Sequence, residues 1–178
     1  MTKPTAAYRP RRLRLRDGRE VTLRAIGASD APEIVQAFER LTTESRYSRF
    51  MQHKRELDAA ALARGVRPRP GIEFAFVATV PAADGIDIVG AAQYVRADEA
   101  DASTCEFAIT VADDWRGSGL ATKLLASLLR RARRDGYTRM EGSVIADNAS
   151  MLALARTLGF TMHRFADDAT VVRVERQL

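Results

Sequence analysis

A glycine-rich turn between a strand-like segment and a helix-like segment is the feature that most constrains how this chain can fold. The first segment, "STCEFAITV" (103–111), alternates in the manner of a half-buried strand. It is followed by "ADDWRGSGLATKLL" (112–125), in which two glycines precede leucines at helical spacing. A strand that enters a helix in this way is typical of an α/β domain, because the helix carries the chain back over the sheet.

The turn also predicts an anion-binding site. Gly117 and Gly119 have no β-carbon, so the backbone N–H groups of the helix that begins near Leu120 stay accessible to a ligand. These groups and the positive end of the helix dipole favour a phosphate, and Arg116 adds a cationic, multidentate donor. An ordinary helix start would satisfy the same groups with a Ser, Asp or Thr side chain.

Three phosphate-binding patterns compete for this turn. A P-loop requires a lysine directly after its last glycine, whereas Lys123 lies inside the predicted helix. The dinucleotide-binding fingerprint requires glycines directly after the strand, a third small residue near Thr122 and further βαβ repeats, which the sequence lacks. The pattern that remains is Arg/Gln-x-x-Gly-x-Gly/Ala, which Arg116, Gly119 and Ala121 satisfy.

With this pattern the chain resembles the GNAT acetyltransferase superfamily, whose members use the turn to hold the pyrophosphate of acetyl-CoA. Two neighbouring features agree with the resemblance. A hydrophobic-x-Val sequence ends the strand, and "ADNASMLALARTLGF" (146–160) supplies Asn148 at a helix start and Gly159 and Phe160 after the helix. The resemblance covers about 21–174. It implies a single-domain α/β fold in which helices flank a mixed central sheet and a splayed strand pair forms the acetyl-CoA cleft.

A narrower resemblance is to the acetyltransferase domain of bacterial Pat-type protein lysine acetyltransferases, which modify acyl-CoA synthetases. It rests on "LRDGREVTLRAI", "ESRYSRF", "CEFAITVADDWRGSGLATKLL" and "RMEGSVIADNASMLALARTLGF". It implies that the acceptor is a protein lysine, in an acyl-CoA synthetase or another protein. Two alternatives stay open, namely a GNAT enzyme that acts on a small-molecule amine and a CoA-binding regulatory domain without turnover.

The strand before the turn supplies a candidate general base. An amine is protonated at neutral pH and cannot attack a thioester until a base removes its proton. Glu106 faces away from Cys105 and Phe107 in the predicted strand, and the Pat-type domain has its catalytic glutamate at the matching position. Glu141 on the next strand is the reserve candidate. Many GNAT enzymes also carry a tyrosine that protonates the leaving thiolate, but here its position is Ala155, as in the Pat-type domains.

The superfamily resemblance also implies which residues bind acetyl-CoA. The end of the strand offers backbone groups to the pantetheine arm, and the turn with the first helical turn holds the pyrophosphate. Asn148 contacts the cofactor or orders the turn. The expected cofactor-binding residues are Ile109, Thr110, Val111, Arg116, Gly117, Ser118, Gly119, Leu120, Ala121 and Asn148.

Composition excludes several other classes of function. One cysteine and two histidines without ligand spacing give no basis for a metal site, and no histidine accompanies Cys105 to make it a nucleophile. No apolar run approaches the roughly 20 residues of a membrane span, so we expect a cytoplasmic protein without a membrane partner.

Positive charge gathers at the N-terminus. Seven lysines and arginines stand against two acidic residues in the first twenty positions, an excess equal to the formal net charge of +5 of the whole chain. We therefore divide the chain into a basic arm (1–12) and an acetyltransferase domain (13–178). The arm solvates the surface or attracts an acidic protein, and nucleic acid is not expected because aromatic stacking residues do not alternate with the arginines.

The rest of the sequence predicts alternating strands and helices. A hairpin is expected to turn at Asp17 and Gly18, and 42–70 gives the weakest signal apart from a turn at "RGVRPRPG". The expected helices are 29–41, capped by Ser29 or Asp30, 56–64, 120–134 and 149–158, and the expected strands are 72–80, 87–95, 103–111, 140–145, 160–165 and 170–176.

Overall fold

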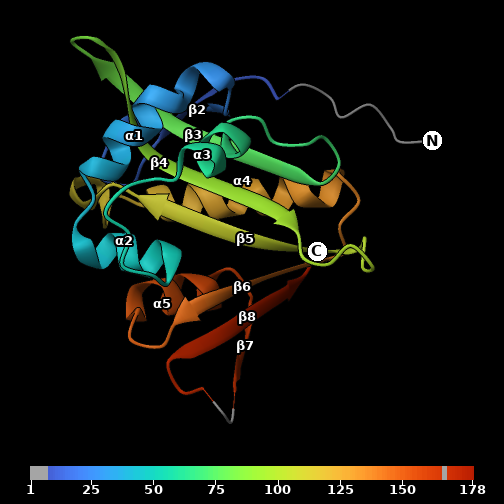
Figure 1. Cartoon of the computed structure of the whole chain (residues 1–178). Coiled ribbons are helices and arrows are strands. Elements are labelled where there is room, and N and C mark those ends of the chain that lie inside the picture. The colour runs from blue at the N-terminus through green and yellow to red at the C-terminus, as the bar shows by residue number, and fades with distance from the viewer. Residues whose placement is uncertain (1–7, 166–167) are drawn as a thin grey trace.

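The computed structural model describes residues 8–165 and 168–178. Within them, eight strands form one sheet in the order β1-β2-β3-β4-β5-β6-β8-β7, and helices cover both of its faces (Figure 1). The predicted mixed sheet flanked by helices is therefore confirmed. None of the helices that the structure describes is both long enough and apolar enough to cross a bilayer.

The first half of the sheet is antiparallel. β1 (Arg11–Arg14) and β2 (Glu20–Ala25) form the predicted hairpin, whose turn holds Gly18 at a φ of 89°. β3 (Glu73–Ala82) and β4 (Gly85–Arg96) run longer than predicted, because the connection between them shrinks to positions 83–84. β5 (Thr104–Val111) pairs with β4 and ends this half of the sheet.

Three helices lie on one face of β3, β4 and β5. A 3-10 turn (Ala28–Asp30) leads into α1 (Ala31–Glu39), followed by α2 (Thr43–Phe50) and α3 (Ala59–Gly65). α1 and α3 correspond to predicted helices, whereas α2 was missed.

The expected capping of the first helix was wrong, since Asp30 makes no side-chain cap to α1. Its buried carboxylate instead pairs with Arg24, with 2.6 Å between Oδ1 and Nη2, and accepts the Gly27 N–H.

The second half of the chain packs two helices on the other face. α4 (Leu120–Arg134) connects β5 to β6 (Arg139–Ile145), and α5 (Ala149–Thr157) connects β6 to β7 (Thr161–Arg164). β8 (Val171–Gln177) then inserts between β6 and β7. Leucines of α4 and α5 are buried with Phe107 and Phe160 in one apolar core, so the leucine spacing that predicted α4 also fixed the face it buries.

Among the described strands, β5 and β6 are the parallel neighbours, and they separate along their length. Their register pairs are Thr104–Arg139, Cys105–Met140 and Glu106–Glu141, although the strands continue to Val111 and Ile145. Figure 1 shows the two ribbons diverging beyond the paired end. Just past the last pair, the ring of Phe107 occupies the space where a side chain at Gly142 would lie. The expected splayed strand pair is present.

The basic arm is only partly described. Its residues 1–7 lie outside the described residues, and Arg11 and Arg12 belong to β1, where they pair with Leu23 and Thr22 of β2. The structured sheet therefore begins before the expected boundary at 13.

Gly142→Ala tests the packing at the point where the strands separate. A β-carbon at this position would lie 2.6 Å from Cε1 of Phe107, so the buried ring would have to move. Such overpacking lowers the free energy of unfolding by about 1–3 kcal/mol, measured by urea denaturation. Gly65→Ala is the control, because a β-carbon there meets nothing within 4 Å. Equal stability of the two variants would contradict the observed packing.

Candidate functional site

The glycine-rich turn presents free backbone donors at the start of α4. φ is 74° at Gly117 and 88° at Gly119, which is the N-cap of α4 and makes no side-chain cap. In the described part of the chain, the N–H groups of Gly119, Ala121 and Thr122 have no acceptor. These N–H groups lie where the sequence predicts an anion site, and they include that of Thr122, which the sequence analysis did not name.

Two of the expected binding residues are buried within the turn. Ser118 and Leu120 are each 1% exposed. The Ser118 hydroxyl donates to the Trp115 carbonyl over 2.6 Å and accepts the Leu120 N–H over 3.2 Å. One N–H of the first helical turn is thus already satisfied, and the serine shapes the turn from inside.

The hairpin between β1 and β2 supports the turn. The Arg16 N–H donates to the Ser118 carbonyl over 3.1 Å, and Arg16 Nη2 donates to the Gly117 carbonyl over 3.0 Å. A β-carbon on Gly119 would face Arg16, 3.5 Å from its Cβ. That distance is an ordinary contact, so glycine is favoured at 119 by its φ of 88° rather than by the hairpin. The charge count alone gave no sign of this structural role for an arginine near the N-terminus.

Arg116 reaches the beginning of α2. Its Nη2 donates to Ser45 Oγ over 2.6 Å and lies 3.1 Å from Asp113 Oδ1. Asp113 also accepts the Ser45 hydroxyl over 2.5 Å and the Thr42 N–H over 3.0 Å. Burial alone would raise the pKa of Asp113, but these hydrogen bonds and Arg116 together lower it. The turn and the start of α2 are thus held together, while the Arg116 side chain stays half-exposed.

β5 has one core face and one open face, as its alternation predicted. Cys105 and Phe107 are buried, and burial raises the pKa of the Cys105 thiol to about 12, so this thiol is no nucleophile at neutral pH. Glu106 is exposed on the opposite face. The expected pantetheine-binding residues, 109–111, pair with β4 but lie beyond the paired part of β6, so their edge is open toward the gap.

Glu106 and the reserve candidate Glu141 lie in register on adjacent strands, so both project from the same face of the sheet. Glu141 is only 9% exposed and pairs with Arg173, with 2.5 Å between Oε2 and Nη2. The backbone of Glu106 is paired in the sheet, but its carboxylate makes no hydrogen bond or ion pair with any described residue. The carboxylate that is free to accept a proton is therefore that of Glu106.

Asn148 caps α5. Its Oδ1 accepts the Met151 N–H over 3.1 Å and the Ser150 hydroxyl over 3.0 Å. The residue lies just after β6, on the far side of the gap from the glycine-rich turn. Its observed contacts order the start of α5.

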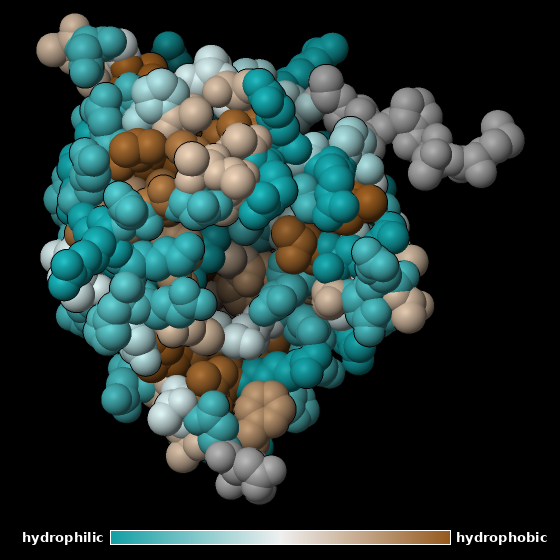
Figure 2. Space-filling view, in the orientation of Figure 1, coloured by the Kyte–Doolittle hydropathy of each residue, from teal (hydrophilic) through white to brown (hydrophobic). Residues whose placement is uncertain are grey.

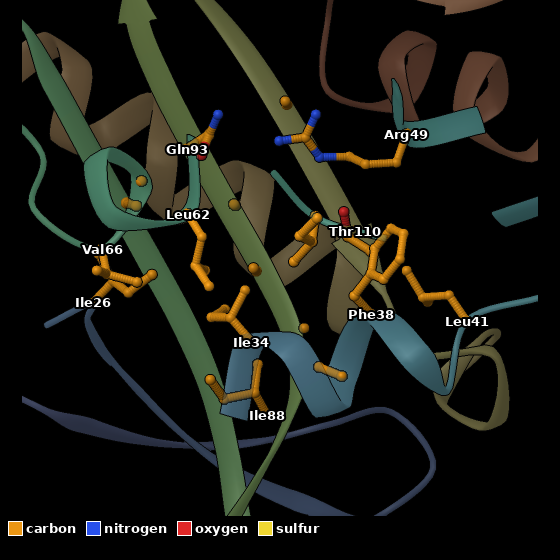
Figure 3. Close-up of a pocket in the computed structure, with 18 of the residues that line it drawn as sticks. Ile26, Ile34, Phe38, Leu41, Arg49, Leu62, Val66, Ile88, Gln93 and Thr110 are labelled. Atoms are coloured by element: carbon orange, nitrogen blue, oxygen red, sulfur yellow. The ribbon is translucent and has the colours of Figure 1, made fainter. Parts of the chain in front are cut away.

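A cavity of about 350 Å³ lies on the open face of β5, between α1, α2, α3 and strands β3 to β5. Its walls are mostly apolar, and Arg49 and Gln93 reach its upper end in the close-up (Figure 3). The space-filling view shows a hollow in this side of the molecule, over the region where β5 and β6 separate (Figure 2). The sequence analysis assigned no functional role to Arg49. No group of His, Cys, Asp and Glu side chains in the described residues could hold a metal ion.

Known proteins are similar to this chain in both sequence and fold. The acetyltransferase (GNAT) domain model matches residues 20–161. An acetyltransferase of Pseudomonas aeruginosa is 34% identical over 158 residues, 89% of this chain and 84% of its own. An L-methionine sulfoximine/L-methionine sulfone acetyltransferase of that species is 38% identical over 76 residues, 42% of this chain and 44% of its own. The GNAT domain of S. lividans Pat superposes with a TM-score of 0.87 and 27% identity, covering 95% of this chain and 97% of that one.

Arg116→Ala tests the turn. We expect it to weaken acetyl-CoA binding by ~1.5–3 kcal/mol, the contribution of a hydrogen bond to a charged group, with little change in stability because the side chain is half-exposed. Calorimetric titration gives the dissociation constant. Arg134→Ala, at the exposed far end of α4, is the control, and an unchanged constant in Arg116→Ala would refute a binding role.

Proposed function

This chain belongs to the GNAT acetyltransferase family, and we propose that it moves the acetyl group of acetyl-CoA directly to a primary amine bound in the same complex. The observation that carries the proposal is the arrangement along β5. A free carboxylate, Glu106, stands where β5 leaves β6, and the anion-binding turn follows the end of the same strand.

The cofactor would be held mainly by backbone groups. The N–H groups of Gly119, Ala121 and Thr122 suit the pyrophosphate, with Arg116 at the rim. The open edge at 109–111 suits the amide groups of the pantetheine arm. Acetyl-CoA held in this way would have its thioester in the gap between β5 and β6, beside the face that carries Glu106.

Glu106 would act as the general base. It takes the proton of the incoming ammonium group, directly or through a water, and the amine nitrogen then bonds to the thioester carbon. The carbon–sulfur bond breaks and CoA leaves as a thiolate. Ala155 is fully buried in the core, so no side chain at that position protonates the thiolate. Either no protein acid is needed, because a CoA thiolate is a tolerable leaving group, or water protonates the thiolate.

Glu106→Gln tests the base, since it keeps the shape of the side chain but removes the proton acceptor. Turnover should fall ~10²–10⁴-fold, and activity should recover partly at high pH, where more of the amine is neutral. The measurement is a pH–rate profile with acetyl-CoA affinity determined in parallel. Glu99→Gln in an exposed loop is the matched control. Near-normal turnover of Glu106→Gln at neutral pH would assign the role to Glu141 or to water.

A protein lysine, in an acyl-CoA synthetase or another protein, is the first candidate acceptor. The Pat-type resemblance supports it, as does the likeness to the GNAT domain of S. lividans Pat. The exposed arginines of β1 would also attract an acidic protein surface and repel small polycations.

Acetyl-CoA-dependent thiol release over an acceptor panel tests this candidate. The panel contains an acyl-CoA synthetase, spermidine and an aminoglycoside, and we expect the protein to be acetylated faster than either polycation. Far faster turnover of spermidine or the aminoglycoside would refute a protein acceptor. Absence of thiol release with every amine, despite acetyl-CoA binding, would favour a regulatory CoA-binding domain.

A small-molecule amine is the second candidate, and one observation favours it specifically. The cavity on the Glu106 face is lined on several sides by helices and strands, which suits a small acceptor better than a protein surface. The similarity to an acetyltransferase of L-methionine sulfoximine and L-methionine sulfone agrees with this candidate.

A further inference from the structure

Arg49 is a half-buried cation that lines a mostly apolar cavity. It lies near the end of α2 and lines the cavity together with Phe50 of the same helix. Its Cζ lies 5.0 Å from the centre of the Phe50 ring. Its guanidinium makes no hydrogen bond or ion pair with the residues that the structure describes, and Figure 3 shows it reaching into the cavity at the end where Gln93 also lies.

Glu106 is the acidic group that acts on Arg49. Burial lowers the pKa of the Arg49 guanidinium, and the charge of Glu106 opposes this effect. An arginine stays protonated at neutral pH in spite of such a shift. The two opposite charges thus lie near one another without forming an ion pair, which leaves each of them available to a ligand.

The remaining charges at the cavity do not neutralise Arg49. Asp58 is engaged as the cap of α3, where its Oδ1 accepts the Ala61 N–H over 2.7 Å. Lys54 adds a second cation, with its Nζ 5.1 Å from the centre of the Phe50 ring. A ligand that filled this cavity without an anionic group would leave the Arg49 guanidinium desolvated and unpaired, which is unfavourable.

This charge arrangement discriminates among acceptors. A polyamine would bring further positive charge to Arg49 and Lys54. A lysine side chain would bring an ammonium group on an alkyl stem and offer no anion to the guanidinium. A free amino acid carries an ammonium group and a carboxylate on the same carbon, so it can face Glu106 and Arg49 at once.

We infer that Arg49 selects the acceptor by binding its carboxylate, and that the acceptor is a small amino acid with an apolar side chain. Its amine faces Glu106, and its side chain enters the cavity of about 350 Å³, whose walls include Ile34, Phe38, Leu62 and Ile88. A guanidinium pairs with a carboxylate through two parallel hydrogen bonds, which fixes orientation as well as affinity. The inference rests on the proposed transfer to an amine beside Glu106. Of the two candidate acceptors for that site, it favours the small-molecule amine over the protein lysine.

The transfer step balances without any further reactant. Glu106 takes one proton of the ammonium group, the nitrogen bonds to the thioester carbon and the carbon–sulfur bond breaks. The second proton that the nitrogen loses passes through water to the departing thiolate. The products are the N-acetyl amino acid and CoA. Arg49 takes no part in bond making, so its contribution should appear mainly in KM for the acceptor.

Acceptor pairs that differ only in the carboxylate test the inference. The pairs are L-leucine with 3-methylbutylamine, L-phenylalanine with 2-phenylethylamine, and L-methionine with 3-(methylthio)propylamine. Thiol release is measured with the unmodified enzyme, Arg49→Met and Arg49→Lys. We expect the unmodified enzyme to prefer the amino acid in at least one pair. Arg49→Met should lower kcat/KM for that amino acid about 10- to 100-fold, the effect of a lost charged hydrogen bond.

The decarboxylated amine is the internal control, since its kcat/KM should change little in Arg49→Met. Arg49→Lys should recover part of the activity toward the amino acid, because lysine keeps the charge but loses the paired geometry. Arg134→Met controls for the loss of an exposed arginine elsewhere. Thermal melting of each variant shows whether it is folded before its kinetics are compared.

Three results would overturn the inference. Equal losses toward the amino acid and its amine would show that Arg49 supports the transfer step itself. Faster acetylation of a protein lysine than of every amino acid would refute the substrate class. If no probe releases thiol, calorimetry with the CoA-loaded enzyme decides. Binding of L-leucine, L-phenylalanine or L-methionine that Arg49→Met abolishes would support the binding role without transfer to these acceptors. Absence of binding would refute the amino-acid acceptor, while the acceptor panel tests transfer to an amine separately.

Discussion

The parallel hydrogen bonding between β5 and β6 stops after the Glu106–Glu141 pair, and the site depends on that interruption. A continuous ladder would satisfy the backbone of 109–111 on both sides and close the gap between the strands. With the ladder broken, one edge of β5 stays open while β4 holds the other edge in place. The core below stays packed because the ring of Phe107 fills the space at Gly142, next to Phe160.

Segments distant in sequence support the glycine-rich turn on several sides. Arg16 holds two of its carbonyl groups, and Arg19 donates to the carbonyl of Asp114 over 3.1 Å while its guanidinium lies 4.0 Å from the centre of the Trp115 ring. Asp113 connects the turn to Thr42 and Ser45 at the start of α2. The backbone donors of the turn are therefore held in position before a charged ligand arrives.

Local patterns were sufficient to predict the strand, turn and helix that carry the site. The alternation in 103–111 identified the face of the strand that carries Glu106, and the leucine spacing after Gly119 identified α4. Both predictions were possible because each pattern lies within a single strand or helix. α2 escaped prediction because its eight residues are mostly polar and its start is tied to Asp113, far along the chain. Asn148 was expected to contact the cofactor or to order the glycine-rich turn, and this stays a prediction. In the structure its side chain caps α5, a role that its place before a helix also suits.

Arg49 and Arg16 show a second limit of sequence reasoning. One lies unpaired in a cavity and the other supports a turn, although both are arginines in stretches rich in charge. What separates their roles is the set of atoms that folding brings around each guanidinium. The sequence alone does not distinguish the two arginines, because it does not show which atoms surround each guanidinium in the folded protein.

The attachment of α2 to the glycine-rich turn has a thermodynamic consequence. The helix that begins at the Asp113–Ser45–Arg116 contacts is the helix that ends with Arg49 and Phe50 in the cavity. A ligand that draws Arg116 toward a phosphate competes with Ser45 for the same guanidinium, and so perturbs the anchorage of the cavity wall. The effect is reciprocal. If the first ligand changes the affinity for the second by some factor, the second changes the affinity for the first by the same factor. Binding of the cofactor and binding of the acceptor would therefore be coupled through α2, without direct contact between the two ligands.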